Sequence, residues 1–326
     1  MRRPVERGTG GAELMASVVG TFTLDPRARK AAAKRRTRGE GATAWAFVSP
    51  SVLIILGLSV IPVLWSLLLS FQANDLVSPS RWVGLANYKA LAADPAFASA
   101  VQHTLVYTAL YVPLSVVGGL AIALMLDRPI RLISLYRTLV FVPFVVSAAA
   151  QGVLFSFVLD PEFGAANSVL HALGLPAQGF FSDPGQALYL LVAISLWSGT
   201  GFCVIVYLAA LQGVPDELVE AARIDGAGRA GVLRHVVLPT LTPVTIFLVL
   251  FQTINALQVF DLVFVTTKGG PLGSTTVIVY FIWEKAFKSF TAGYSAAAAY
   301  ALAIALLVAG LALQLYQRRR TGKALR

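Results

Sequence analysis

Residues 188–211 read LYLLVAISLWSGTGFCVIVYLAAL, and the chain continues through residues 212–227 as QGVPDELVEAARIDGA. The first stretch carries no charged side chain, whereas the second is rich in acids and glycine. A helix that crosses a bilayer needs about 20 mostly apolar residues, because each residue rises about 1.5 Å and the hydrocarbon core is about 30 Å thick. This part of the chain therefore predicts a transmembrane helix that leads into a polar loop.

The composition of the whole chain agrees with this interpretation. Of 326 residues, 57% are hydrophobic and 13% are charged, and the mean hydropathy is +0.73. Ordinary soluble domains have about 45–50% apolar and about 25% charged residues. These values exclude a soluble enzyme, a disordered protein and a disulfide scaffold, and they indicate an integral membrane protein.

Six apolar stretches are long enough to cross a membrane. Because the backbone of each must satisfy its own hydrogen bonds in lipid, we expect six helices and an all-α polytopic fold. A seventh apolar piece, Thr275–Trp283, is too short and is interpreted as an interfacial or re-entrant segment. The six expected spans are Trp45–Phe71, Thr104–Leu126, Leu135–Leu159, Leu188–Leu211, Leu241–Val265 and Tyr294–Tyr316.

The positive charges predict the orientation of these spans. With the N-terminus inside, the inner segments carry Lys and Arg as follows: ten in 1–44, three in 127–137, three in 212–240 and five in 317–326, against five in all outer segments. Because cytoplasmic loops are enriched in Lys and Arg, both termini are predicted to be cytoplasmic. The net charge of +10 then reflects topology and requires no nucleic-acid partner.

Several kinds of site are missing from the sequence. It contains no G-x-x-x-x-G-K-[ST] phosphate loop, and its three histidines fall in different segments, so we expect neither bound ATP nor a metal. Cys203 is the single cysteine and is expected to be a small buried residue. Asp261 is the one clear charge within a span, whereas carriers driven by ions usually use several such groups.

The loop after the fourth span is predicted to contain a short helix. Pro215 suits the first helical position, and Asp216 and Glu217 follow in the first turn, where the helix dipole favours acids. Gly226 provides a stop.

This short helix has the character of a docking element. Leu218, Ala221 and Ala222 form a narrow apolar stripe, and Glu220 and Asp225 add charges beside it. The alternative is an amphipathic connector on the lipid surface, but that role is typical of helices with large aromatic or Lys-rich faces. The pattern favours docking to another protein.

Two groups of residues in the chain resemble a known family. The first resembles the EAA loop of binding-protein-dependent ABC importer permeases and consists of Glu220-Ala221-Ala222, Asp225-Gly226-Ala227 and Leu238-Pro239. The second, from Phe260 to Pro271 with Thr275-Thr276 and Gly293-Tyr294, is similar to carbohydrate permeases of the MalF/UgpA type. Val232-Leu233 departs from relatives that often have Phe there.

The resemblance implies a fold and a set of partners. The fold would be the MetI-like core of type I importers with one extra N-terminal helix: a permease domain at 44–316 with its coupling loop at 212–240, and basic tails at 1–43 and 317–326. The chain would pair with a second, similar permease, with a dimer of cytoplasmic ATPases that use ATP and Mg²⁺, and with an extracytoplasmic solute-binding protein, in a bacterial cell membrane. It would bind no cofactor itself.

Polar residues within the spans are candidates for a solute pathway. Gln252 and Asn255 share a helix face, with Gln258 one step further round, and Trp197 and Gln151 lie in other spans. The alternative is that such residues only hydrogen-bond neighbouring helices.

The resemblance implies that a second set forms a gate or packs the outer end of the pathway: Asp261, Gly269, Gly270 and Pro271. It also implies a sugar, an oligosaccharide or a glycerol-phosphate compound as substrate. The absence of Lys or Arg in mid-span favours a neutral solute. An ABC permease for another solute class, an ion-coupled carrier and a membrane enzyme are the remaining alternatives.

Overall fold

The computed structural model describes residues 44–75, 78–128 and 131–324. The basic tail predicted at 1–43 lies outside these residues. The chain divides into two units, residues 1–65 and 66–326, and each is considered by itself. In the first unit the described residues belong to an apolar helix that begins at Ala44 and runs on to Ser70, and its side chains are largely exposed.

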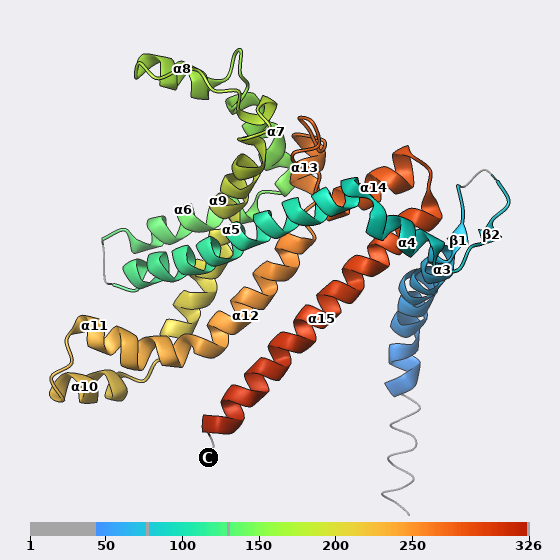
Figure 1. Cartoon of the computed structure of the whole chain (residues 1–326). Helices are drawn as coiled ribbons and strands as arrows, with labels where there is room; N and C mark the ends of the chain where they lie inside the picture. Colours follow the sequence, from blue (N-terminus) through green and yellow to red (C-terminus); the bar gives the residue numbers. More distant parts are fainter. Residues whose placement is uncertain (1–43, 76–77, 129–130, 325–326) are drawn as a thin grey trace, which may run out of the picture. The chain divides into compact units, whose positions relative to one another are not determined.

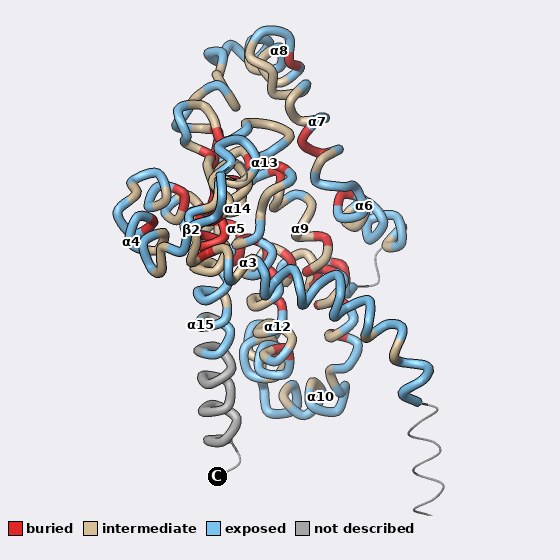
Figure 2. Tube along the Cα trace, turned by 90° about the vertical axis from the view of Figure 1, so that its right-hand side faces the viewer, coloured by how far each residue is buried: buried red, intermediate tan, exposed pale blue. Residues whose placement is uncertain are grey.

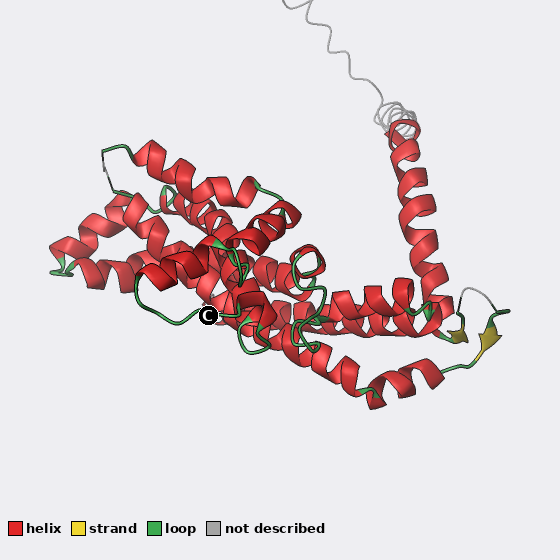
Figure 3. Cartoon of the chain, turned by 90° about the horizontal axis from the view of Figure 1, so that it is seen from above, coloured by secondary structure: helices red, strands yellow, loops and turns green. Residues whose placement is uncertain are grey.

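Most of the described chain is helical, as Figure 3 shows. Two short strands pair antiparallel, with Gln72 opposite Trp82 and Ala73 opposite Arg81. In chain order the elements are η1 (Leu56–Val60), α3 (Ile61–Ser70), β1 (Gln72–Ala73), β2 (Arg81–Trp82), α4 (Ala86–Ala93), α5 (Pro95–Leu126), α6 (Ile133–Val145), α7 (Ala148–Val158), α8 (Ala165–Ala172), η2 (Phe180–Ser182), α9 (Ala187–Leu211), α10 (Asp216–Ile224), α11 (Arg229–Val232), η3 (Leu233–Val237), α12 (Leu238–Leu257), α13 (Asp261–Val265), α14 (Ile278–Trp283), η4 (Glu284–Lys288) and α15 (Ala292–Ala324).

The all-helical membrane fold is confirmed, while the number of spans is only partly matched. Among the described residues, four helical stretches have the length and apolarity of a span: Ala44–Ser70, Pro95–Leu126, Ala187–Leu211 and Arg229–Val265. The pair α6 and α7 makes a fifth if counted as one, and Ala292–Val308 is a shorter apolar segment of α15. Six crossings therefore stay a prediction.

The third expected span is not one straight helix, which corrects the prediction for Leu135–Leu159. Helices α6 and α7 meet at an angle of 97°. Val146 is extended, and Ser147 caps the new helix by accepting a hydrogen bond from the Ala150 amide at 3.3 Å. A new N-cap of this kind starts a helix in a different direction.

The fifth expected span, Leu241–Val265, is also interrupted. Helix α12 ends at Leu257, and α13 begins only at Asp261. The residues between them leave the helical path, since Phe260 has φ −143° and ψ −58°. The short piece expected at Thr275–Trp283 contains the six-residue helix α14.

Helices α5, α9 and α12 pack against one another and form the main core of the second unit (Figure 1). Buried residues gather along these helices, whereas α10 is coloured mainly as exposed (Figure 2). Gly119 of α5 lies against Cys203 of α9, and any side chain at Gly119 would collide with it. Cys203 is fully buried, as expected from the sequence. Close helix approach at small residues is typical of membrane proteins.

Candidate functional site

The loop helix predicted from the sequence is present as α10. It runs over Asp216–Ile224, with Asp216 and Glu217 in its first turn and Arg223 in its last. This arrangement places acids at the positive end of the helix dipole and a base at the negative end. Pro215 is the residue before the helix, one position earlier than expected, because its ψ of 127° is extended.

The C-terminus of α10 closes with a Schellman motif. The Ala227 amide donates to the Ala222 carbonyl at 2.9 Å, and the Gly226 amide donates to the Arg223 carbonyl at 3.0 Å. Gly226 adopts φ +85°, a conformation that a residue with a side chain rarely takes. The predicted helix stop at Gly226 is therefore confirmed.

Helix α10 presents its side chains outward. None of its residues is buried. Among its apolar residues, Leu218 is 51% exposed and Ile224 is 86% exposed. Glu220, Ala221 and Asp225 are exposed as well, and Ala222 is half-buried. An exposed apolar stripe beside carboxylates suits a protein partner, and Ile224 extends that stripe beyond the residues chosen from sequence.

A continuous helical path leads from this loop into the membrane. After Gly228 the chain is helical from Arg229 through α11, η3 and α12, and it passes Leu238 and Pro239 at the start of α12. Leu238 is 38% exposed and Pro239 is exposed, so both lie at the surface. We call this helical path, from Arg229 to Leu257, the rod. It also carries Gln252 and Asn255 further along α12.

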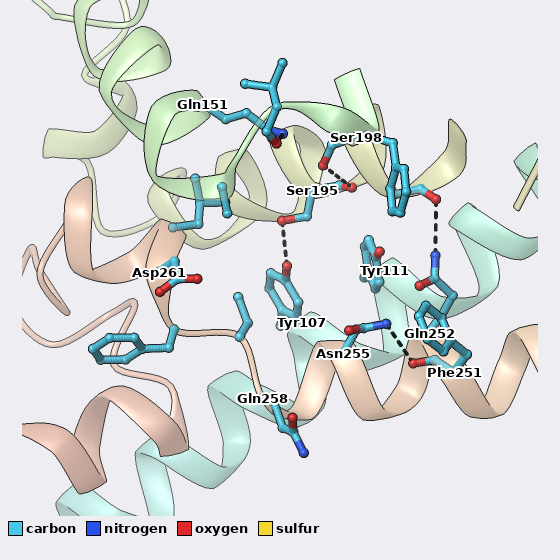
Figure 4. A pocket seen from close by; sticks show the side chains of 17 residues that line it. Tyr107, Tyr111, Gln151, Ser195, Ser198, Phe251, Gln252, Asn255, Gln258 and Asp261 are labelled. Atoms are coloured by element: carbon cyan, nitrogen blue, oxygen red, sulfur yellow. Dashed lines mark hydrogen bonds between the residues drawn. The ribbon is translucent and has the colours of Figure 1, made fainter. Parts of the chain in front are cut away.

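A cavity of about 450 Å³ lies where the helices of the core are broken. It is bordered by both interruptions, at Val146 between α6 and α7 and at Val259 between α12 and α13. Non-helical backbone at membrane depth is tolerated where it lines a cavity or is covered by protein. Figure 4 shows the lining side chains: Tyr107, Tyr111, Phe144, Val146, Ala148, Gln151, Ser195, Ser198, Gly199, Phe251, Gln252, Asn255, Gln258, Val259, Phe260, Asp261 and Leu262.

Gln151 borders the cavity and also holds the first interruption together. Its side-chain amide donates to the carbonyls of Pro143 at 3.0 Å and Val146 at 2.8 Å, and the residue is 4% exposed. These carbonyls are freed by the bend between the two helices. Gln151 therefore stabilises the shape of the cavity wall.

Gln252 and Asn255 line the cavity in different ways. Gln252 is 2% exposed, and its amide donates at 3.3 Å to both the Gly199 carbonyl and the Cys203 sulfur. It thus joins α12 to α9. This matches the alternative given above, in which polar residues within spans hydrogen-bond neighbouring helices. The Asn255 amide donates to the Phe251 carbonyl of its own helix, and the side chain is exposed.

Gln258 and Asp261 flank the second interruption and are both exposed. Within the described part of the chain, neither side chain forms a hydrogen bond or an ion pair. Asp261 is also the only charged side chain among the lining residues. The polar atoms that are free to meet a solute are therefore concentrated at this end of the cavity.

The aromatic wall comes from residues that the sequence reasoning did not select. Tyr107 and Tyr111 stack with ring centroids 5.8 Å apart, and the Tyr107 hydroxyl donates to the Ser195 hydroxyl at 2.6 Å. Trp197 does not line the cavity; it is 47% exposed and packs edge-on against Phe155. Their spacing of four residues places both tyrosines on one helix face, and this is the sequence signal that could have identified them.

The residues predicted to gate or pack the outer end of the pathway, Gly269, Gly270 and Pro271, form a tightly bonded loop. Gly269 has φ +81°, and a side chain there would collide with Tyr280. The Thr275 hydroxyl donates to the Gly270 carbonyl at 2.7 Å. The Ser274 amide donates to the Pro271 carbonyl at 3.0 Å. These contacts show packing within the loop, while a gating role stays a prediction.

Comparisons with known proteins place this geometry in context. The family described as "Binding-protein-dependent transport system inner membrane component" matches residues 115–322. The lactose transport system permease protein LacF of Rhizobium radiobacter is 36% identical over 281 residues, which cover 84% of this chain and 93% of the relative. The sn-glycerol-3-phosphate transport system permease protein UgpA of Pectobacterium atrosepticum is 33% identical over 269 residues, covering 82% and 90%.

The fold is shared with a chain of a bacterial ABC transporter involved in the import of the acidic polysaccharide alginate. The TM-score is 0.79 at 23% sequence identity, over 87% of this chain and 98% of that one. At this level of identity the similarity concerns the fold alone.

Proposed function

The chain belongs to the family of inner membrane components of binding-protein-dependent transport systems, and from this premise we propose that it forms half of the pore of an importer for a neutral, sugar-type solute. It is a multi-pass permease subunit of an ABC importer, the class to which its relatives belong. The solute and the way in which energy reaches the pore are the proposed parts.

The lining of the cavity carries the proposal for the solute. Phe144 and Phe251, which are 41% and 37% exposed, offer apolar ring surface beside the buried tyrosines. Asn255, Gln258 and Asp261 offer hydrogen-bonding groups that other side chains leave free or nearly free. Ligand pockets generally combine apolar walls with a few polar groups that fix orientation. A sugar, with its apolar ring faces and hydroxyl rim, matches this combination.

The charge of the lining argues against an anionic solute. No Lys or Arg lines the described cavity, and the single carboxylate of Asp261 would repel a phosphate. One feature favours a glycerol-phosphate compound as the second candidate: the N-terminal end of α7, at Ala148, borders the cavity, and helix N-termini attract anions.

The exposed surface of α10 supports the proposal for coupling. We infer that a cytoplasmic ATPase seats Glu220, Ala221 and the end of the helix in a groove, and that the partner ATPase dimer binds ATP and Mg²⁺. Movement of the ATPase would shift the rod that begins at Arg229, and with it the cavity residues on α12. A second permease would complete the pore, a binding protein would deliver the solute, and both termini would be cytoplasmic.

The test is reconstitution with the partner permease, the ATPase and the binding protein. ATPase stimulation is measured with neutral saccharides, with glycerol 3-phosphate and with its diesters, and omission of the binding protein is the control. Stimulation by a neutral saccharide is expected. Stimulation by the phosphates alone would replace the neutral solute with the second candidate, and uptake without ATP that an ionophore abolishes would indicate a carrier.

A further inference from the structure

A second, larger pocket lies at the other end of the rod, beside the loop that carries α10. Its volume is about 920 Å³. Its walls come from the last turn of α5 and from Arg128 just beyond that helix. The end of α10, α11 and η3 complete them. It is separate from the solute cavity, because the two share no lining residue.

Three arginines and no acid border this pocket. Arg128 follows α5, Arg223 lies in the last turn of α10, and Arg229 begins α11. Within the part of the chain that the structure describes, none of these side chains forms a hydrogen bond or an ion pair. Three guanidinium groups around one hollow create a site for an anion, and Arg is well suited to phosphate.

The rest of the wall is apolar. Leu124, Val232, Leu233 and Val237 complete it. Leu124 belongs to a span, so the apolar part of the pocket is continuous with the membrane end of α5. A ligand that fills the pocket therefore needs both a negative head and an apolar body.

We propose that this pocket binds the phosphate headgroup of an anionic phospholipid, with Arg128 and Arg229 on the phosphate and the start of an acyl chain along the apolar wall. Basic pockets at the cytoplasmic ends of transmembrane helices are suited to such headgroups. The chain's own tails are unsuited, because residues 1–44 carry ten Lys and Arg against four Asp and Glu, and residues 317–326 carry five against none. The lipid would hold the base of the α10 loop at the membrane surface.

The test compares two variants with equal loss of charge, each purified as the assembled transporter. R128Q/R229Q removes two pocket arginines and leaves α10 intact, and R131Q/R234Q removes two exposed arginines of the same cytoplasmic segments that do not border the pocket. Phosphatidylglycerol retained after detergent washing is measured by native mass spectrometry. Phosphatidylcholine and inorganic phosphate are the competitors.

Each arginine near a lipid headgroup contributes about fivefold in affinity, so R128Q/R229Q should retain phosphatidylglycerol roughly twenty-fold more weakly, with the control unchanged. Equal retention in both variants would overturn the proposal. Displacement of the lipid by inorganic phosphate at equal concentration would also overturn it, because a free anion would then suffice. Loss of the ATPase from R128Q/R229Q with lipid retention unchanged would instead assign the pocket to an acidic surface of the ATPase.

Discussion

Helix α10 and the cavity wall both place polar residues on helices, but they treat those residues in opposite ways. In the wall, Gln151 and Gln252 spend their amides on backbone carbonyls of neighbouring elements and are almost fully buried. On α10, Glu220 is exposed beside an uncovered apolar stripe, and Asp225, which caps the helix, is exposed as well. The polar groups of the wall are satisfied within this chain, whereas α10 leaves an exposed surface on which the proposed partner could dock.

The largest expected effect comes from reversing a charge on α10. Glu220→Lys should lower uptake at least about a hundred-fold, because a like charge placed against a basic partner surface costs several kcal/mol. The amount of permease in the membrane should not change, since Glu220 is exposed. Uptake of radiolabelled solute and immunoblotting of membranes measure the two quantities.

The matched control is Glu162→Lys, which reverses an exposed carboxylate between α7 and α8. It should leave uptake within about twofold of the wild type. Normal uptake by Glu220→Lys would remove the docking role of α10.

Loss of the Gln151 amide should be the next largest effect, and it falls on stability. Gln151→Leu leaves the carbonyls of Pro143 and Val146 without their donor, at a cost of about 2 kcal/mol in the free energy of unfolding. Thermal unfolding of the purified protein measures it.

Gln258→Leu is the comparison for this variant, because Gln258 is exposed at the cavity and its side chain has no partner among the described residues. It should unfold at the wild-type temperature while transport slows. If both variants unfold alike, the wall is not held by Gln151.

A smaller effect is expected at the end of α10. Gly226→Ala forces a side chain into φ +85° and should raise local opening of residues 216–227 about fivefold, from about 1 kcal/mol of strain. Gly228→Ala has equal space around it but sits at φ −69°, so its exchange should not accelerate. Hydrogen–deuterium exchange of the two variants separates the effect of the positive φ from the effect of the added methyl group. Equal exchange rates in the two variants would contradict the Schellman motif at the end of α10.

The smallest effect concerns the N-terminal end of α5, which Asp94 caps. The Tyr294 hydroxyl donates to Asp94 at 2.7 Å and lowers the pKa of that carboxyl below its ordinary value of about 3.9. A carboxyl whose pKa is lowered in the folded state stabilises the fold at pH values above its ordinary pKa. This stabilisation is lost as the pH falls through the folded-state pKa. Tyr294→Phe should therefore lower the free energy of unfolding at pH 7 by less than about 1 kcal/mol, because Asp94 is partly exposed. Thermal unfolding at a series of pH values measures it. The difference should shrink below about pH 4, and a difference that grows instead would contradict this sign.

Much of the fold was predictable from the hydrophobic content of segments and from residues that start or stop helices. The apolar runs place the first residue of five of the six expected spans within three residues, but α5 begins nine residues before Thr104 and α15 continues eight residues past Tyr316. Asp216, Glu217 and Gly226 mark the two ends of α10. These signals are local, because they depend on the hydrophobic content of a segment or on the conformation of a single residue.

The breaks and the aromatic wall were not predictable in the same way. The run through Val146 carries no charge from residue 138 to residue 159, and Pro143 alone does not predict a break, because α5 continues unbroken through Pro113. The bend depends on capping by Ser147 and on the Gln151 amide, which bonds carbonyls of the preceding segment. Tyr107 and Tyr111 face the cavity only because Gly199 lets α5 approach α9, since a side chain there would collide with the Tyr111 hydroxyl. Such contacts join residues far apart in the chain.

The burial of Cys203 against Gly119 has a practical consequence. The chain has one thiol, and it is shielded from solvent between two packed helices. A fluorophore or spin label added to the folded protein would therefore react with cysteines introduced at exposed positions such as Ile224, without replacement of Cys203. Distances between labels on α10 and on the far end of α12 could then be followed during a transport cycle in an otherwise native sequence.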